Sequence, residues 1–186
     1  MKVVISEVIS AIWFVVLIAF VATAGVLKPK AATEPIHVWI RRAFLLGMSL
    51  LLLFSSPRSE SPLSWRLLPA SDAIEWVGCF LTLAGAGFAI WARLWLGSNW
   101  SFMTTVRGEH DLVKSGPYAI VRHPIYSGLI IGMTGTAVVL GEIRGFIGVL
   151  VAAIIWWRKA NAEESLLLDR FGSEYLLYAK KVRRLF

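Results

Sequence analysis

Long apolar runs are the feature that most limits how this chain can fold. Residues 3–27, 36–54 and 74–96 each contain a window of about 19 residues with few charges, which is the length that a helix needs to cross the hydrocarbon core of a bilayer. Of the 186 residues, 57% are hydrophobic, well above the share in an average soluble domain. Three membrane-spanning helices are therefore predicted in this first part of the chain.

A fourth apolar run covers residues 125–157, but the sequence GEIRG at 141–145 interrupts it near its middle. Two short helices, 125–140 and 146–157, joined by a tight turn fit this pattern better than one long helix. The chain is therefore predicted to be an all-α, polytopic membrane protein with five transmembrane helices, of which the last two form a helical hairpin.

Positive charges gather on one side of the predicted spans. Lysine and arginine beside a span are retained on the cytoplasmic side. If the N-terminus lies outside, that side receives Lys28, Lys30, Arg41, Arg42, Arg93, Arg107, Lys114, Arg122 and the basic tail 158–184, whereas the other receives only Lys2, Arg58, Arg66 and Arg144. We therefore expect the linker after the third span and the C-terminal tail to be cytoplasmic. The brevity of the chain favours a prokaryotic plasma membrane.

The net charge of +7 is spread around the span ends without a basic stripe interleaved with stacking aromatics, so it indicates anionic lipid headgroups as partners and not nucleic acid. The single cysteine, Cys79, lies inside the third span, which leaves no disulfide framework and no thiolate metal site. His110 and His123 are 13 residues apart and have no third histidine nearby, so no metal is expected.

We expect one membrane domain over residues 1–186, whose two halves differ in character. Residues 1–96 form a scaffold of three helices, and their Ser/Pro-rich loop 55–72 has no evident catalytic group. Residues 97–186 combine a polar linker, the hairpin and a tail with acidic, basic and aromatic side chains. Chemistry is therefore expected in this second half.

The linker contains two proline turns, Gly116-Pro117-Tyr118 and His123-Pro124-Ile125-Tyr126. Each proline fixes its own backbone and biases its predecessor away from the helix. Non-helical backbone near a membrane is tolerated where it is buried in protein or lines a water-filled cavity. One interpretation is therefore that the free amides and carbonyls of these turns bind a polar ligand. The other is a simple re-entry turn into the fourth span, with Tyr118 and Tyr126 as interfacial anchors.

The tail is predicted to be helical from 158 to 171, with Gly172 as a left-handed cap and a second helix starting near Glu174. Lys159 and Glu163 are four residues apart and share one face of that first helix, and Glu164 follows. An acidic pair this close to hydrocarbon is costly unless it meets a partner or a ligand. An ordinary i,i+4 pair on an amphipathic surface helix is the alternative.

Three separated motifs carry a resemblance to a known family. LGSNWS at 96–101, GEHDLVKSGPYAIVRHPIYSG at 108–128 and KANAEESLLLDRFGSEYLLY at 159–178 resemble the signature of the isoprenylcysteine carboxyl methyltransferase family, to which the phospholipid methyltransferases are related. The resemblance covers the C-terminal half. It implies an integral membrane methyltransferase that uses S-adenosylmethionine, with a cytosolic cofactor pocket formed by the linker after the third helix and the C-terminal helices.

The resemblance also implies roles for individual residues. The cofactor pocket would be lined by His110, Leu112, Val113, Tyr118, His123, Pro124, Ile125 and Tyr126, and Glu163 would bind the cofactor. The family commonly has an arginine four positions before that glutamate, where it is associated with the substrate. This chain has Lys159 there and Arg158 beside it, so the resemblance leaves open which cation faces the substrate.

The expected reaction is methyl transfer to a lipophilic acceptor, an in-line displacement in which positioning supplies much of the rate. A carboxylate acceptor, as in an isoprenylcysteine, is already nucleophilic and would be oriented by Lys159 or Arg158. An amine acceptor, as in a phospholipid N-methyltransferase, would need a base, for which Glu164 is the nearest candidate. The remaining alternatives are a sterol-reductase-like enzyme that uses NADPH, and a membrane scaffold or small transporter without catalysis.

Overall fold

The computed structural model describes residues 2–23, 35–54, 61–97 and 112–185. These residues form five α-helices, two 3-10 turns and two isolated bridges, and no strand lies within them. The elements in chain order are α1 Lys2–Ala22, α2 Ile36–Phe54, η2 Pro62–Ser64, α3 Asp72–Leu96, η4 Gly116–Ala119, α4 Pro124–Leu140 and α5 Ile143–Lys181. The all-α prediction is confirmed.

Two of these helices are long and apolar enough to cross a membrane by length and composition, α1 over Val4–Ala22 and α3 over Asp72–Leu96. The helix α4 is also apolar but is shorter, with 17 residues. In α2, Arg41 and Arg42 interrupt the apolar sequence near the start, and α5 carries Arg144 in its first turn and further charges from Arg158 onward. Five transmembrane helices therefore remain a prediction.

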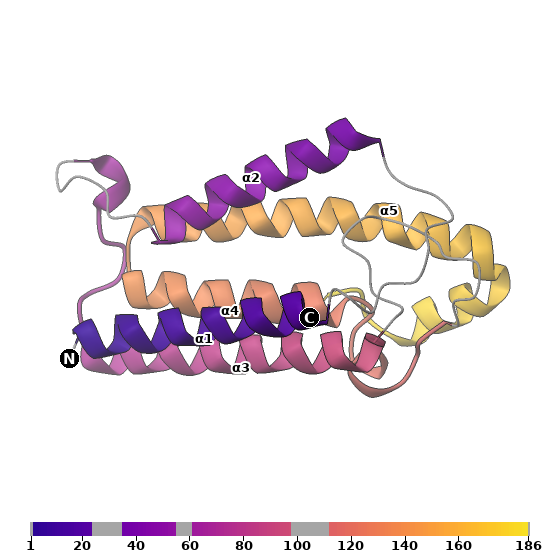
Figure 1. Cartoon of the computed structure of the whole chain (residues 1–186), viewed down its shortest axis with the longest axis horizontal. Helices are drawn as coiled ribbons and strands as arrows, with labels where there is room; N and C mark the ends of the chain where they lie inside the picture. The colour runs from indigo at the N-terminus through magenta and orange to yellow at the C-terminus, as the bar shows by residue number, and fades with distance from the viewer. Residues whose placement is uncertain (1, 24–34, 55–60, 98–111, 186) are drawn as a thin grey trace.

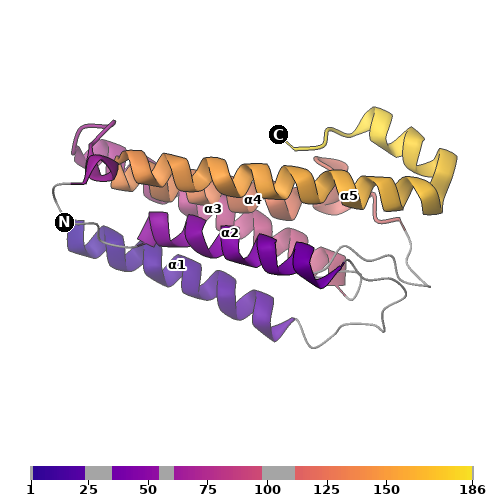
Figure 2. The ribbon, with the colours of Figure 1, turned by 90° about the horizontal axis from the view of Figure 1, so that it is seen from above.

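The helices lie roughly along one long axis (Figures 1 and 2). The helix α3 packs against both α1 and α4, α4 packs against α5, and α2 covers the far side of α5. This order places the linker before α4 and the second half of α5 at the same end of the bundle (Figure 1).

The contact between α3 and α4 is made backbone to backbone through small residues. A Cβ atom at Gly85 would lie 2.3 Å from the backbone nitrogen of Gly132, and one at Gly135 would lie 2.4 Å from the backbone nitrogen of Thr82. The Thr82 hydroxyl donates to the Gly78 carbonyl at 2.9 Å, so it needs no polar partner from the lipid side. Small residues allow this approach in apolar surroundings, where dispersion contacts must replace a hydrophobic driving force.

The hairpin turn between α4 and α5 consists of Gly141 and Glu142. Gly141 has φ 65° and ψ 10°, the left-handed conformation that glycine adopts without a Cβ clash. Its carbonyl accepts from the backbone N–H groups of Leu67 and Leu68, which ties the turn to the segment before α3. The predicted break at 141–145 is therefore present.

The helix α5 differs from the prediction of separate helices over 146–157 and 158–171. It runs without a break from Ile143 to Gly172, where φ of 49° and ψ of −121° interrupt it, and then continues to Lys181. The boundary expected at Arg158 is absent because residues 158–164 contain no helix breaker and mostly good helix formers. Gly172 has the positive φ expected of it, but its ψ of −121° lies outside the left-handed helical region, so the predicted left-handed cap is not formed.

Substituting Gly85 tests whether the α3–α4 contact holds the bundle together. Gly85→Ala is expected to destabilise the protein by about 1–3 kcal/mol, because a methyl group there overlaps the Gly132 backbone. Gly87→Ala is the matched control, since a Cβ at that position in the same helix meets nothing within 4 Å. Thermal unfolding of the purified variants in detergent measures both, and equal midpoints would contradict the assignment.

Candidate active site

The linker before α4 is held against the end of α3. Gly116 has φ +60°, and a Cβ there would lie 2.4 Å from the indole of Trp95, so both its conformation and its surroundings require glycine. Pro117 and Tyr118 are buried. His123 is the residue before the first turn of α4, and Pro124 fills the first helical position, where a missing N–H costs nothing. The two proline turns thus place His123 at the start of α4.

Glu163 of α5 faces this start of α4. The Tyr126 hydroxyl donates to its Oε1 at 2.7 Å, and His123 Nδ1 lies 3.5 Å from its Oε2. The Lys159 ammonium, one turn earlier, lies 3.7 Å from Oε1. The Glu163 side chain keeps 24% of its exposure, so it remains partly accessible to a ligand.

Glu164 is held by a second set of donors. Arg122 Nε donates to its Oε1 at 2.9 Å, and His123 Nε2 lies 3.1 Å from the same oxygen. Arg184 Nη2, from the C-terminal tail, bonds to Oε2. Its side chain is 12% exposed, so Glu164 is more enclosed than Glu163.

Three aromatic rings stack beside the carboxylates. The His123 and Tyr126 rings are parallel within 8° with centroids 5.4 Å apart, and Tyr126 continues the stack onto Trp156 at 6.3 Å and 5°. The Lys159 ammonium lies 5.6 Å from the Tyr126 ring centroid, within the range of a cation–π interaction. The stack fixes the ring of His123 between the two carboxylates.

The pKa values of the three central groups shift in the directions of an imidazolium between two carboxylates. Burial alone would lower the pKa of His123, but its hydrogen bonds to Glu163 and Glu164 outweigh burial and raise it. Burial would raise the pKa of Glu163, yet His123 and the Lys159 charge lower it. Burial likewise opposes ionisation of Glu164, and its bonds to His123, Arg184 and Arg122 keep that pKa low.

The structure brings together five of the residues singled out in the sequence, namely His123, Tyr126, Lys159, Glu163 and Glu164. A neighbouring apolar cluster contains Tyr118 and Ile125 with Val113 packed against it. Leu112 is half-buried, and Arg158 is exposed. His110 lies outside the described residues.

Arg122, Trp156 and Arg184 are site residues that the sequence analysis did not find. Arg122 immediately precedes His123, so the charged neighbour of a predicted site residue was a usable signal. Trp156 reads as one more apolar residue of a span. Arg184 reads as part of a basic tail beside the membrane, and no local pattern indicates that its guanidinium meets a carboxylate 20 residues earlier.

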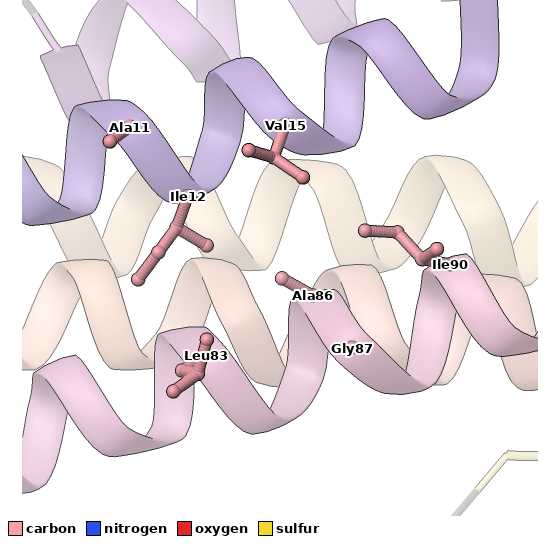
Figure 3. A pocket seen from close by; sticks show the side chains of 7 residues that line it. All are labelled: Ala11, Ile12, Val15, Leu83, Ala86, Gly87 and Ile90. Atoms are coloured by element: carbon pink, nitrogen blue, oxygen red, sulfur yellow. The ribbon is translucent and has the colours of Figure 1, made fainter. Parts of the chain in front are cut away.

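A separate hollow of about 240 Å³ lies between α1 and α3 (Figure 3). Its lining is apolar and comprises Ala11, Ile12, Val15, Leu83, Ala86, Gly87 and Ile90. It offers no partner for a polar cofactor. A hydrocarbon chain is the kind of group that such a lining accommodates.

Comparison with known protein families shows to which family this chain belongs. Residues 74–174 match the family model described as phospholipid methyltransferase, and this match covers more than half of the chain. The chain belongs to the phospholipid methyltransferase family. The matched residues include the linker, the hairpin and the two glutamates. Both sides of the contact between Glu163 and the start of α4 therefore lie within the match.

Individual relatives carry a more specific name. The chain is 38% identical over 78 residues to the protein-S-isoprenylcysteine O-methyltransferase of Schizosaccharomyces pombe, covering 40% of this chain and 32% of that protein. The proteins of the same name from Xenopus laevis and Homo sapiens are 33% and 34% identical, and each match covers 75% of this chain. This member of the phospholipid methyltransferase family spans about half the length of those two relatives, 51% and 52%.

The pKa directions predict how stability depends on pH. The raised pKa of His123 means that its contribution is complete below its ordinary value of 6.5 and is lost as pH rises through the folded-state pKa. The lowered pKa of Glu164 means that its contribution is present above its ordinary value of 4.5 and is lost as pH falls through the folded-state pKa. His123→Gln should therefore remove the alkaline loss of stability.

Thermal unfolding of the detergent-solubilised protein checks this expectation when it is measured between about pH 5 and pH 9, because histidine titrates within this range. His37→Gln is the matched control, because His37 is exposed near the start of α2. An alkaline loss of stability that persists unchanged in His123→Gln would show that His123 does not carry it.

Proposed function

We propose that this chain is a membrane methyltransferase that uses S-adenosylmethionine and acts on a lipophilic acceptor at the cytoplasmic end of its helix bundle. The observation that carries the proposal is the contact between Glu163 and the His123–Tyr126 turn. It joins the two segments in which the sequence analysis expected the cofactor pocket, and it orients a partly exposed, ionised carboxylate there. The family match and the names of the relatives support it.

The chemistry of the donor set fits this cofactor. A ribose presents hydroxyl donors, and Glu163 is an acceptor whose low pKa keeps it ionised at neutral pH while its side chain stays 24% exposed. The apolar cluster that contains Tyr118 and Ile125, with Val113 against it, suits an adenine ring. We assign cofactor binding to these residues together with Leu112, His123, Pro124 and Tyr126, and to His110 by resemblance alone.

When bound, S-adenosylmethionine supplies a methyl group on a sulfonium centre. The chain's own residues then have the tasks of binding and of excluding water. His123 and Tyr126 orient Glu163 through its two oxygens, and the stacked rings limit their movement. A positioned site of this kind accelerates a displacement without a covalent nucleophile.

Lys159 is the cation that we assign to the acceptor. Its ammonium lies between Glu163 and the Tyr126 ring, whereas the Arg158 side chain is exposed. A carboxylate acceptor needs such a cation and no base, so an isoprenylcysteine-like or other lipid acid fits the residues best. The apolar hollow between α1 and α3 supports a lipophilic acceptor, because it lies along the two helices most suited to span the bilayer.

The phospholipid name of the family favours an amine as the second candidate acceptor. Methyl transfer to an amine needs a neutral nitrogen or a base. Glu164 was the predicted base, but its oxygens already accept from Arg122 and Arg184 and its pKa is held low. A carboxylate so occupied is a weak base, and we assign it a structural role.

Binding of S-adenosylhomocysteine tests the cofactor assignment. Calorimetric titration of the full chain in detergent should give saturable binding, and Glu163→Gln should weaken it by about tenfold or more, since a hydrogen bond to a charged group is lost. Asp169→Asn is the matched control, because Asp169 is an exposed acid on the same helix. Binding of NADPH instead would indicate a reductase, and binding of neither would indicate a scaffold.

Methyl-labelled cofactor tests the acceptor. Label incorporated into membrane lipid should be released as volatile methanol by base, as an ester requires, whereas a methylated amine retains it. Lys159→Met should raise the KM for the acceptor by about tenfold, as expected for loss of a charged contact, and Arg158→Met should not. Base-stable label, or a larger effect at Arg158, would refute the assignment of Lys159 to a carboxylate.

A further inference from the structure

The C-terminal tail folds back onto the candidate site. The chain reverses after Gly172 (Figure 2), and residues 182–185 then pass beside the linker before α4. The backbone N–H groups of Arg122 and His123 donate to the carbonyls of Arg183 and Arg184, at 2.8 and 3.1 Å. The tail lies beyond residue 174, where the family match ends.

Side chains hold the same segment in place. Arg122 Nη1 donates to the carbonyls of Ala179 and Val182 at 2.9 and 2.7 Å, which joins the linker to the end of α5. Leu185 is buried, with 8% of its surface exposed. The tail is therefore fixed by backbone pairing, by a guanidinium and by apolar burial.

Arg184 is the tail residue that reaches α5. Its guanidinium bonds to Glu164 Oε2, donates to Asn161 Oδ1 at 2.6 Å and lies 4.8 Å from the ring centroid of Trp157. Residues 157, 161 and 164 are four and three positions apart, so they form one stripe along the helix. Arg184 thus covers one stripe of α5 that ends at Glu164.

We propose that Arg184 is a positioning residue of the methyl-transfer site: it fixes the carboxylate of Glu164, which in turn holds His123 against Glu163. This inference rests on the proposed function, because that function identifies the site as one for methyl transfer. The geometry of the chain of contacts, from Arg184 to Glu164 to His123 to Glu163, is independent of that function.

The two oxygens of Glu164 explain why Arg184 has this effect although Arg122 binds the same carboxylate. Arg122 and His123 both meet Oε1, at 2.9 and 3.1 Å, whereas Arg184 meets Oε2. A carboxylate held by both oxygens cannot rotate, whereas one held by Oε1 alone can turn away from His123. The His123 ring would then keep its stack on Tyr126, but its one remaining carboxylate contact would be Glu163 at 3.5 Å, a distance too long for a strong hydrogen bond.

The titration of His123 distinguishes positioning from simple electrostatics. The groups that face His123 are Glu163 and Glu164 from α5, Tyr126 from α4, Arg122 from its own linker and Arg184 through the tail. Removing a cation while the geometry stays intact would raise the His123 pKa further. If Glu164 instead turns away, His123 loses a carboxylate partner and its pKa falls. The proposal requires the fall.

The experiment uses the full-length protein in detergent with isotopically labelled histidine. NMR follows the His123 imidazole against pH without cofactor, with its signal assigned by His123→Gln, and calorimetry measures S-adenosylhomocysteine affinity. Arg184→Ala should lower the His123 pKa and weaken binding by about tenfold, as expected for loss of a charge-assisted bond. Arg183→Ala is the matched control, because this adjacent arginine has an exposed side chain, and it should change affinity by less than about twofold.

A double-mutant cycle shows whether Arg184 acts through Glu164. In the Glu164→Gln background, Arg184→Ala should change affinity by less than about twofold, because the carboxylate that it positions is gone. Arg184→Lys, which keeps the charge but has a single donor nitrogen in place of the guanidinium fork, should recover part of the binding and supplies the comparison if the alanine variant does not fold.

Three results would overturn the proposal: a rise of the His123 pKa in Arg184→Ala, an affinity equal to that of Arg183→Ala, or full additivity with Glu164→Gln. Failure of the wild-type chain to bind S-adenosylhomocysteine would instead refute the proposed function. The His123 titration, measured without ligand, would still decide whether Arg184 positions Glu164.

Discussion

Two adjacent carboxylates lie at the end of an apolar helix bundle, and their charge must be compensated where they stand. An ionised carboxylate that loses water is costly unless cations and hydrogen-bond donors replace it. Glu163 and Glu164 obtain these from separate parts of the chain: Tyr126, His123 and Lys159 for the first, Arg122, His123 and Arg184 for the second. His123 is common to both sets, so the imidazole is the point at which the linker, α4 and α5 are joined.

The rest of the fold serves to keep that junction in register. Backbone contact between α3 and α4 at Gly85 and Gly132 brings the two helices so close that a Cβ at Gly85 would overlap the backbone of α4. Gly116 packs directly against the Trp95 indole, which holds the linker at the end of α3. The start of α4, and with it His123, is therefore held by contacts with α3 as well as by the carboxylates of α5.

The same arrangement gives each glutamate a different character. Glu163 keeps more exposure and is oriented by a hydroxyl, an imidazole and an ammonium, which suits a carboxylate that must accept from a ligand. Glu164 is enclosed by two guanidinium groups, which suits a fixed counter-charge. Neighbours in sequence thus have separate tasks because α5 turns by about 100° between them, as any α-helix does, and presents them to different partners.

The sequence alone determined the helical class, the hairpin break at Gly141 and the positive φ of Gly172, because apolar run length and glycine act locally. The family resemblance pointed to His123, Tyr126, Lys159 and Glu163, whose side chains the structure brings together and whose roles stay a proposal. The sequence did not determine that α5 continues past Trp157, since good helix formers and a span boundary give competing signals there. Tertiary structure alone decided that the Arg158 side chain is exposed, that Glu164 meets two guanidinium groups, and that one of these is Arg184 from the C-terminal tail. These depend on which groups folding brings within hydrogen-bonding distance across intervals as long as the 41 residues between His123 and Glu164, and no local pattern encodes such a distance.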